Sequence, residues 1–221
     1  MKIAYDKMST VLEITSNRAV GMIIENPKFL HRFLSDMKNA LEGNESGFVF
    51  SKQDRVVTAS KMVDMVTDFI YLQLGKRTIM NKVISNLEQT ALSGRFYQET
   101  QELLGAIENF VMDLTLDVPC DLVIEKQTIQ GLLKGIGLSI LDKYDSLEER
   151  ILAYMDLVRE YEKKELFVFY NLRGLIPYDT LNLMVNTALE REHCILLVDC
   201  AEYPSLTRED RLIVDKDLCE I

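Results

Sequence analysis

Residues 166–199 read LFVFYNLRGLIPYDTLNLMVNTALEREHCILLVD, and this stretch decides the fold. Residues 166–170 and 195–198 are uninterrupted apolar runs, as expected for strands that are buried on both faces of a sheet. Between the two runs, apolar residues recur at the spacing of one helix face: Leu181, Met184, Val185, Ala188 and Leu189. The stretch therefore predicts a strand, a helix and a second strand, which is the repeating unit of a parallel sheet.

The N-terminal residues predict a further set of strands. Three short apolar or alternating runs are separated by polar turn residues: 2–5, 11–14 and 19–24. Asn26 is placed to cap a helix with Pro27 at its first position, and Gly43 ends the amphipathic stretch that follows. Residues 48–50 read as the next strand. This order predicts that the strands on either side of the helix form a parallel pair with a right-handed crossover.

The middle of the chain has a helical pattern. From residue 60 to residue 164 apolar residues recur with a period of about 3.6, which predicts several helices, and Ser146 and Glu149 form a capping box for the last one. The predicted fold class is α/β, with one mostly parallel sheet built from both ends of the chain and an inserted α-helical lobe. We expect a discontinuous head domain of residues 1–59 and 165–221 and a helical leg domain of residues 60–164.

The composition favours a soluble protein with a packed core. Of the 221 residues, 48% are hydrophobic, which is enough apolar surface to offset the entropy lost on folding. The sequence shows no signal-peptide pattern and no apolar run of about 18 residues, so we expect a cytoplasmic protein without a membrane partner. Cys120, Cys194, Cys200 and Cys219 lack the spacing of a metal site and are expected to be reduced thiols.

The formal net charge of −10 argues against a nucleic-acid partner unless the basic residues are segregated on one surface. Several basic residues on or beside the helical lobe could face a phosphate backbone: Lys52, Lys76, Arg77, Lys82, Lys126, Lys134 and Lys143. Each of them could equally serve as an ordinary solvated surface residue. As a set they matter only if assembly brings several copies of the chain together.

Two stretches resemble parts of a nucleotide-binding site. Residues 75–78 (GKRT) are similar to the end of a P-loop, and residues 195–199 (ILLVD) are similar to the strand whose final aspartate positions magnesium. A working loop requires glycine at the position of Ile70 and Ser or Thr at the position of Arg77. The sequence therefore predicts a head related to degenerate P-loop folds, with no catalytic residues and no enzymatic activity.

Asp113, Asp117, Asp121 and Glu125 form an acidic run around Pro119. The proline breaks the helix, so side chains and freed carbonyl groups can converge on one loop, and hard oxygen ligands of this kind suit calcium. The alternative is a solvated acidic turn, since the glycine-turned twelve-residue calcium loop is missing. The spacing permits both interpretations.

The order of these elements resembles the Csn-two family, the small accessory protein of type II-A CRISPR adaptation loci. The resemblance rests on residues 163–171 (KKELFVFYN), 195–199 (ILLVD) and the acidic tail 215–221 (DKDLCEI), together with residues 132–137 (LLKGIG). It covers essentially the whole chain.

Members of that family are ring-shaped homotetramers with an α/β head and a helical leg. They encircle double-stranded DNA, thread on from its ends, hold calcium and support the acquisition of new spacers, without an established enzymatic activity. The resemblance implies that basic side chains line the hole, while acidic side chains occupy the outer face and the metal sites. It carries over most directly to Lys134 and to the acidic loop around Asp121 and Glu125.

The leading hypothesis is sequence-independent, calcium-assisted binding of double-stranded DNA by a homotetrameric ring. The ring would act beside the CRISPR integrase and effector nuclease during spacer acquisition. A second hypothesis is a degenerate nucleotide-binding enzyme, which requires nucleotide affinity despite the broken loop. A third is a helical adaptor that binds only proteins, which predicts that the chain retains no DNA at any calcium concentration.

Overall fold

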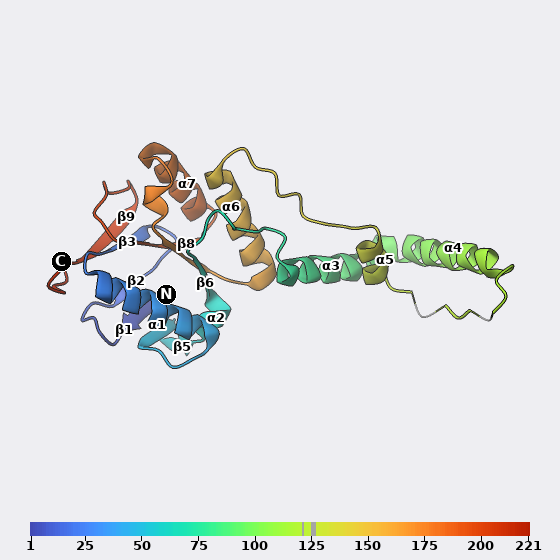
Figure 1. The fold of residues 1–221 in the computed structure, drawn as a ribbon, viewed down its shortest axis with the longest axis horizontal. Coiled ribbons are helices and arrows are strands. Elements are labelled where there is room, and N and C mark those ends of the chain that lie inside the picture. The colour runs from blue at the N-terminus through green and yellow to red at the C-terminus, as the bar shows by residue number, and fades with distance from the viewer. Residues whose placement is uncertain (121, 125–126) are drawn as a thin grey trace. The chain divides into compact units, whose positions relative to one another are not determined.

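The computed structural model describes residues 1–120, 122–124 and 127–221, and the chain divides into two compact units. The head unit comprises Met1–Leu74 and Asp142–Ile221, and the helical unit comprises Gly75–Leu141. Figure 1 labels the helices and strands of both units. The helical unit therefore begins 15 residues later than the predicted leg domain, at residue 75 and not 60. It ends 23 residues earlier, at residue 141 and not 164.

The head unit is built on a five-stranded sheet in the order β6-β7-β8-β3-β9, in which all neighbouring strands are parallel. Its strands are β6 (Val63–Val66), β7 (Leu166–Tyr170), β8 (Cys194–Asp199), β3 (Ala19–Ile24) and β9 (Glu209–Val214). The predicted α/β class is confirmed, and so is the strand, helix, strand unit of residues 166–199, with helix α7 spanning Tyr178–Glu190.

Both faces of this sheet are covered. Side chains alternate along a strand, so Val168 and Leu196 join the core on the side of helix α1 (Pro27–Glu42), while Phe167 lies on the opposite side against the ring of His193. Figure 1 shows α6 and α7 on that opposite side and α1 below the sheet. Burial on both faces explains why β7 and β8 are apolar without interruption.

The N-terminal strands form a separate antiparallel sheet in the order β2-β1-β4-β5. Its strands are β1 (Lys2–Tyr5), β2 (Leu12–Glu13), β4 (Phe48–Lys52) and β5 (Arg55–Val57). The predicted parallel pairing of β3 with β4 is wrong, because β4 pairs antiparallel with β1. Phe48 packs on Phe33 of α1, with their ring centroids 5.1 Å apart. The chain that follows α1 thus folds back against this helix and does not join the parallel sheet.

Helix α1 has the predicted ends. Asn26 Oδ1 accepts hydrogen bonds from the backbone N–H groups of Lys28 and Phe29, each at 3.1 Å, and Pro27 occupies the first position. Gly43 ends the helix at φ 78°, a left-handed conformation that glycine adopts without steric cost. The sequence signals for this helix were sufficient because they are local.

The helical pattern predicted from residue 60 is wrong over its first part. Helix α2 spans only Ala59–Met62, and the following residues form β6, which pairs with β7. At the other end, α6 (Leu147–Leu157) begins at the predicted Ser146 cap, is continued by a π-helical turn over Val158–Glu162 and packs against α7. Tyr154 Oη donates to Asp64 Oδ2 at 2.8 Å, which joins α6 to β6 and accounts for the shifted boundaries.

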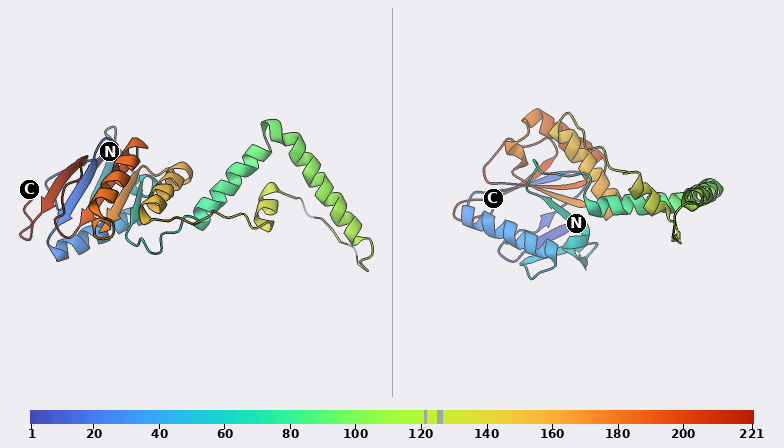
Figure 2. Two further views of the ribbon diagram at one scale, coloured as in Figure 1. Left: turned by 90° about the horizontal axis from the view of Figure 1, so that it is seen from above. Right: turned by 45° about the vertical axis from the view of Figure 1, so that its right-hand side comes forward.

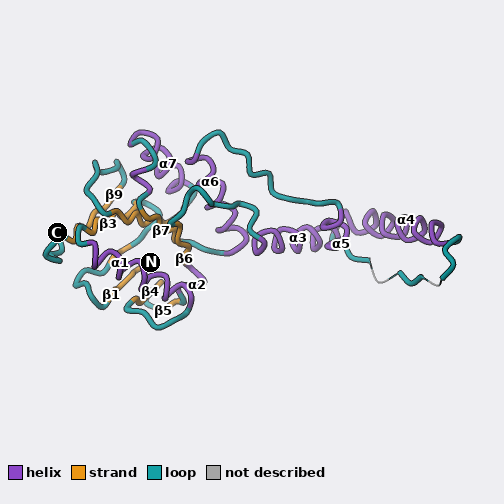
Figure 3. Tube along the Cα trace, viewed as in Figure 1, coloured by secondary structure: helices purple, strands orange, loops and turns teal. Residues whose placement is uncertain are grey.

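The helical unit contains α3 (Arg77–Ala91), a 3-10 turn (Gly94–Phe96), α4 (Tyr97–Thr115) and α5 (Ile129–Gly135). Figures 2 and 3 show that α4 runs on from the turn at the end of α3 and that α5 lies beside α3. Few of its side chains are buried, among them Ile79, Ile84 and Ile129. Within the described residues, none of the helices is both long and apolar enough to span a bilayer.

Candidate nucleic-acid interface

Helix α3 turns an apolar side toward its own unit and a polar side toward solvent. Ile79 and Ile84 are buried, and α5 packs against the helix. At about 100° per residue, six of the seven exposed polar side chains of α3 fall within one half of the helix circumference, and the seventh, Thr90, lies outside it. We call this set the donor face of α3, because each member carries a hydrogen-bond donor: Arg77, Thr78, Asn81, Lys82, Asn86 and Gln89.

The donor face is almost free of carboxylates, although the chain as a whole is strongly acidic. Glu88 is the one acidic residue of α3, and its Oε2 accepts a hydrogen bond from Gln130 Nε2 of α5 at 2.6 Å. Helix α4, by contrast, carries four acidic residues and neither Lys nor Arg. Positive charge in this unit is therefore concentrated away from α4. The donor face of α3 carries two cations and one carboxylate, Glu88, which is held by Gln130 but keeps its charge.

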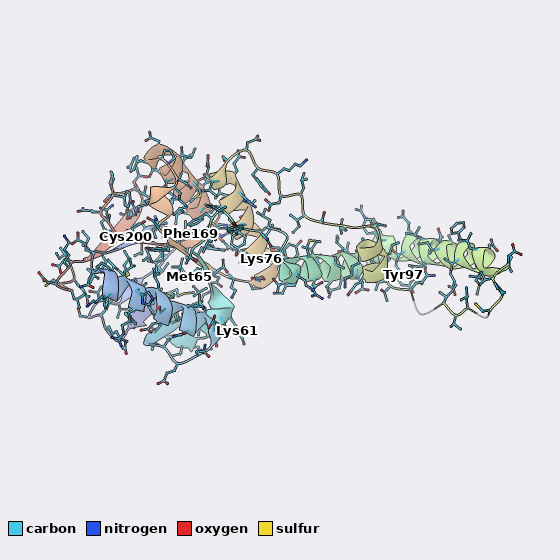
Figure 4. The ribbon with its side chains drawn as sticks, in the orientation of Figure 1. Lys61, Met65, Lys76, Tyr97, Phe169 and Cys200 are labelled. Atoms are coloured by element: carbon cyan, nitrogen blue, oxygen red, sulfur yellow. The ribbon has the colours of Figure 1, made fainter. Side chains whose placement is uncertain are left out.

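The amino end of α3 strengthens the case for an anionic ligand. Lys76 stands at the cap position, Arg77 is the first helical residue, and the first turn has no acidic residue. Figure 4 shows Lys76 at the start of this helix. The first backbone N–H groups of a helix lack intrahelical partners and carry partial positive charge, so they favour phosphate.

The structure places four of the seven predicted basic residues in the helical unit. Lys76, Arg77 and Lys82 lie at or within α3. Lys134 is exposed on α5, the short helix that packs against α3. These four are the predicted residues that can contribute to one surface of this unit.

Of the other three predicted basic residues, two belong to the head unit and the third is not among the described residues. Lys52 lies in β4 of the head unit, where its Nζ is 2.5 Å from Glu165 Oε2. Lys143 is exposed in the head unit, and Lys126 lies outside the described residues. The ion pair of Lys52 satisfies a carboxylate of the protein, which leaves this side chain less able to neutralise a phosphate.

Sequence reasoning missed the uncharged part of the donor face. Asn81, Asn86 and Gln89 are exposed on the same side of α3 as Arg77 and Lys82. Their signal was present in the sequence as a helical polar face with a single carboxylate, Glu88. A search restricted to Lys and Arg could not find it.

The predicted calcium ligands are divided between described and undescribed residues. Asp113 lies in the last turn of α4, Asp117 follows the helix, and both are exposed. Asp121 and Glu125 lie outside the described residues. In residues 1–120, 122–124 and 127–221, no three His, Cys, Asp or Glu side chains are grouped closely enough to hold a metal ion. The calcium site therefore stays a prediction.

The strand that resembles a magnesium-positioning strand is β8, and the carboxylate at its end is already paired with an arginine of the chain. Asp199 is fully buried, and its Oδ2 accepts a hydrogen bond from Arg173 Nε at 2.8 Å. The segment Gly75–Thr78 follows a loop and begins α3, so it lies in the helical unit and not behind a strand of the sheet. The two halves of the P-loop resemblance therefore belong to different units of the chain. The carboxylate of Asp199 forms an ion pair with Arg173.

A cavity of about 510 Å³ in the head unit is lined by basic and acidic side chains at the amino ends of β7 and β8. Arg159 pairs with Glu192 at 3.1 Å, and Lys163 lies 3.8 Å from Glu160. Lys164 donates to the backbone carbonyl of Ser60. The cavity has no surplus of positive charge, so it offers an anion less than the donor face of α3 does.

Comparison with known proteins gives one family. The family described as CRISPR-associated protein (Cas_Csn2) matches residues 40–218. Among solved structures, the chain is similar to a Pyrococcus furiosus protein described as an ABC transporter (ATP-binding protein), with 12% identity and a TM-score of 0.41 over 96% of this chain and 94% of that one. A search of the curated proteins returns no match.

Proposed function

The chain belongs to the CRISPR-associated Csn2 family, and from this premise we propose that it binds double-stranded DNA through the donor face of α3. One observation carries the proposal: an exposed helix face bears Arg77, Lys82 and amide donors with a single carboxylate, Glu88, in a chain of net charge −10. Such segregation is what an acidic protein needs to approach a phosphate backbone. The proposed binding requires no catalytic step.

The chemistry of the donor face favours phosphate contacts over base readout. Lys, Arg, Thr, Asn and Gln side chains and helix amino ends are the groups that contact phosphate oxygens in protein–DNA complexes. These contacts fix the position of the protein without reading sequence. We therefore propose sequence-independent binding that weakens steeply as salt is raised.

A single chain offers too few cations for tight binding, so the proposal includes assembly. Arg77 and Lys82 of one copy can neutralise about two phosphates, whereas six or more contacts are typical of strong, salt-sensitive binding. A homotetramer would present four copies of α3 around one duplex. It would also place the acidic surfaces of the chain away from the DNA.

The helical unit carries a surface suited to such assembly. In α4 the residues Leu103, Ile107, Phe110 and Leu114 are spaced four, three and four positions apart, which is the spacing of a coiled-coil seam. Leu103, Phe110 and Leu114 are 48%, 63% and 62% exposed. Apolar side chains at this spacing need a facing helix, and a second copy of α4 would supply one.

We predict that the double variant Phe110→Asp, Leu114→Asp lowers the order of self-association. Charged side chains cannot be buried unpaired in a helix seam, so the assembly should dissociate toward smaller species. Sedimentation velocity across a concentration series measures this change. The control is Asn109→Asp, which adds charge to an exposed position of the same helix outside the seam. If the double variant sediments like the wild-type chain, the seam is not the interface.

Calcium has a defined place in this proposal. Asp113 and Asp117, with Asp121 and Glu125, supply oxygen ligands near the end of α4, and a bound divalent cation would offset part of the acidic excess. The assembled ring would hold DNA for the CRISPR integrase and effector nuclease during spacer acquisition. Double-stranded ends are the form of DNA that a ring can thread without opening.

The deciding experiment compares linear with covalently closed DNA of the same sequence in a gel-shift assay. We expect calcium to promote retention of the linear form alone, and a chelator to reduce it. The logarithm of the association constant should fall linearly with the logarithm of the salt concentration, with a slope near −0.9 for each phosphate neutralised. Absence of binding to either form, at any calcium concentration, would refute the proposal and favour a protein adaptor.

A further inference from the structure

A cluster of charged side chains is buried on the α7 side of the parallel sheet. Asp199 ends β8, Glu209 begins β9, and Arg173 lies in the 3-10 turn Leu172–Gly174 that follows β7. Arg173 Nε donates to Asp199 Oδ2 at 2.8 Å, and Arg173 Nη2 donates to Glu209 Oε1. The three residues are 7%, 0% and 7% exposed in the order Arg173, Asp199, Glu209. One guanidinium thus joins the ends of two strands.

The cluster also holds the segment between those two strands. Arg173 Nη1 donates to the carbonyl of Pro204 at 3.2 Å, and the backbone N–H of Leu206 donates to Glu209 Oε2 at 2.7 Å. We call residues 200–208 the closing segment. Gly21 of β3 makes room for the Glu209 carboxylate, since a Cβ atom there would lie 1.8 Å from Glu209 Oε1.

The second oxygen of Asp199 is left without a partner. Asp199 Oδ1 is buried, and among the described residues no donor reaches it. A buried carboxylate oxygen without a donor costs free energy, and the cost is much larger for the anion than for the neutral acid. The geometry therefore favours a proton at this position.

The surroundings of Asp199 include all the charged groups that act on this proton. Arg173 and Arg211 oppose protonation, and Glu209 favours it, while burial is the largest effect and raises the pKa of Asp199 to about 6. Tyr170 at the end of β7 and Cys200 complete the set, and burial followed by the Cys200 and Asp199 charges raises the pKa of Tyr170. The effect of burial on the pKa of Asp199 is thus larger than the opposing effect of the two arginines.

We propose that Asp199 binds a proton in the folded head unit, so that lowering the pH favours the closed cluster and with it the contacts that hold the closing segment. The cluster is then a pH-responsive latch. The folded chain holds the proton more firmly than the unfolded chain, so the contribution to stability is present below pH 3.8 and is lost as the pH rises through 6. The proposal is independent of the proposed DNA binding.

The direct test is the titration of the Asp199 side-chain carboxyl carbon by NMR in the wild-type protein. We expect a midpoint near pH 6. A midpoint at or below 3.8, the ordinary value, would show that Arg173 keeps the carboxylate ionised and would overturn the latch. This measurement needs no variant and so does not depend on how well a substituted chain folds.

The second test uses Asp199→Asn, which fixes the side chain in a neutral form. The folding equilibrium constant of the wild type should fall by roughly 50-fold relative to that of the variant between pH 4 and pH 7. Amide exchange of Leu206, corrected for intrinsic rates, should slow on acidification in the wild type alone. The matched control is Asp210→Asn on β9, where the carboxylate is 61% exposed and pairs with Arg18. Equal pH profiles for the wild type and Asp199→Asn would contradict the proposal.

Discussion

The double variant Arg77→Glu, Lys82→Glu is expected to bind linear double-stranded DNA on the order of 100-fold more weakly than the wild-type chain at low salt. Both side chains lie on the donor face of α3, and each reversal replaces an attraction to phosphate by a repulsion. In an assembly, every copy of the chain repeats the loss. Fluorescence anisotropy with a labelled duplex measures the change, and the remaining binding should show a shallower dependence on salt.

The control for this variant separates local contacts from net charge. Lys28→Glu, Arg55→Glu changes the net charge by the same amount at two exposed positions of the head unit. We expect this control to retain most of the affinity, because neither residue belongs to the donor face and exposed charges act only over a Debye length of about 8 to 10 Å. If the two double variants lose affinity equally, the donor face has no special role and overall charge governs binding.

Replacing Arg173 by Met is expected to lower the free energy of unfolding by about 3–5 kcal/mol. The change leaves the carboxylates of Asp199 and Glu209 buried without the cation that links them. Urea denaturation followed by circular dichroism at pH 7.5 measures the loss. This is the largest effect on stability that we expect from a single substitution in the cluster.

Two further variants make that result specific. Arg208→Met removes a half-buried arginine whose Nε donates to the carbonyl of Asn17, and it should cost less than about 1 kcal/mol. The triple variant Arg173→Met, Asp199→Asn, Glu209→Gln should recover part of the lost stability, because no charge remains buried. A loss for Arg173→Met no greater than that for Arg208→Met would show that the buried ion pairs add little.

The parts of the fold that depend on local signals were predictable from the sequence. The caps at Asn26, Gly43 and Ser146 lie where their residue types indicate, and the apolar runs of β7 and β8 are buried strands. Local rules could not assign β4 to a second sheet, since sheet membership is decided by which distant strand lies beside it. They also could not identify β6, a short strand within an apolar pattern that fitted a helix.

The candidate interface was predictable only in part, for a related reason. Arg77 and Lys82 were identified from charge alone. Asn81, Asn86 and Gln89 become candidates only because the helix places them on the same face as those cations. Lys52 was misleading because its partner Glu165 is remote in sequence and meets it through the fold. A single sequence gives the residue types of a surface and leaves their neighbours to be found in the structure.

The position of β3 in the parallel sheet has a consequence for biosynthesis. This strand lies between β8 and β9, both of which are synthesised after it and after the whole helical unit. The apolar residues of β3 therefore lack both neighbouring strands while more than a hundred further residues are synthesised. An unpaired nascent strand can form non-native pairings or bind a chaperone. Helices α3 and α4, whose hydrogen bonds are local, can form in the meantime. Slow translation would lengthen the exposure of β3 and should lower the yield of folded protein more than it would for a domain whose strands pair in chain order.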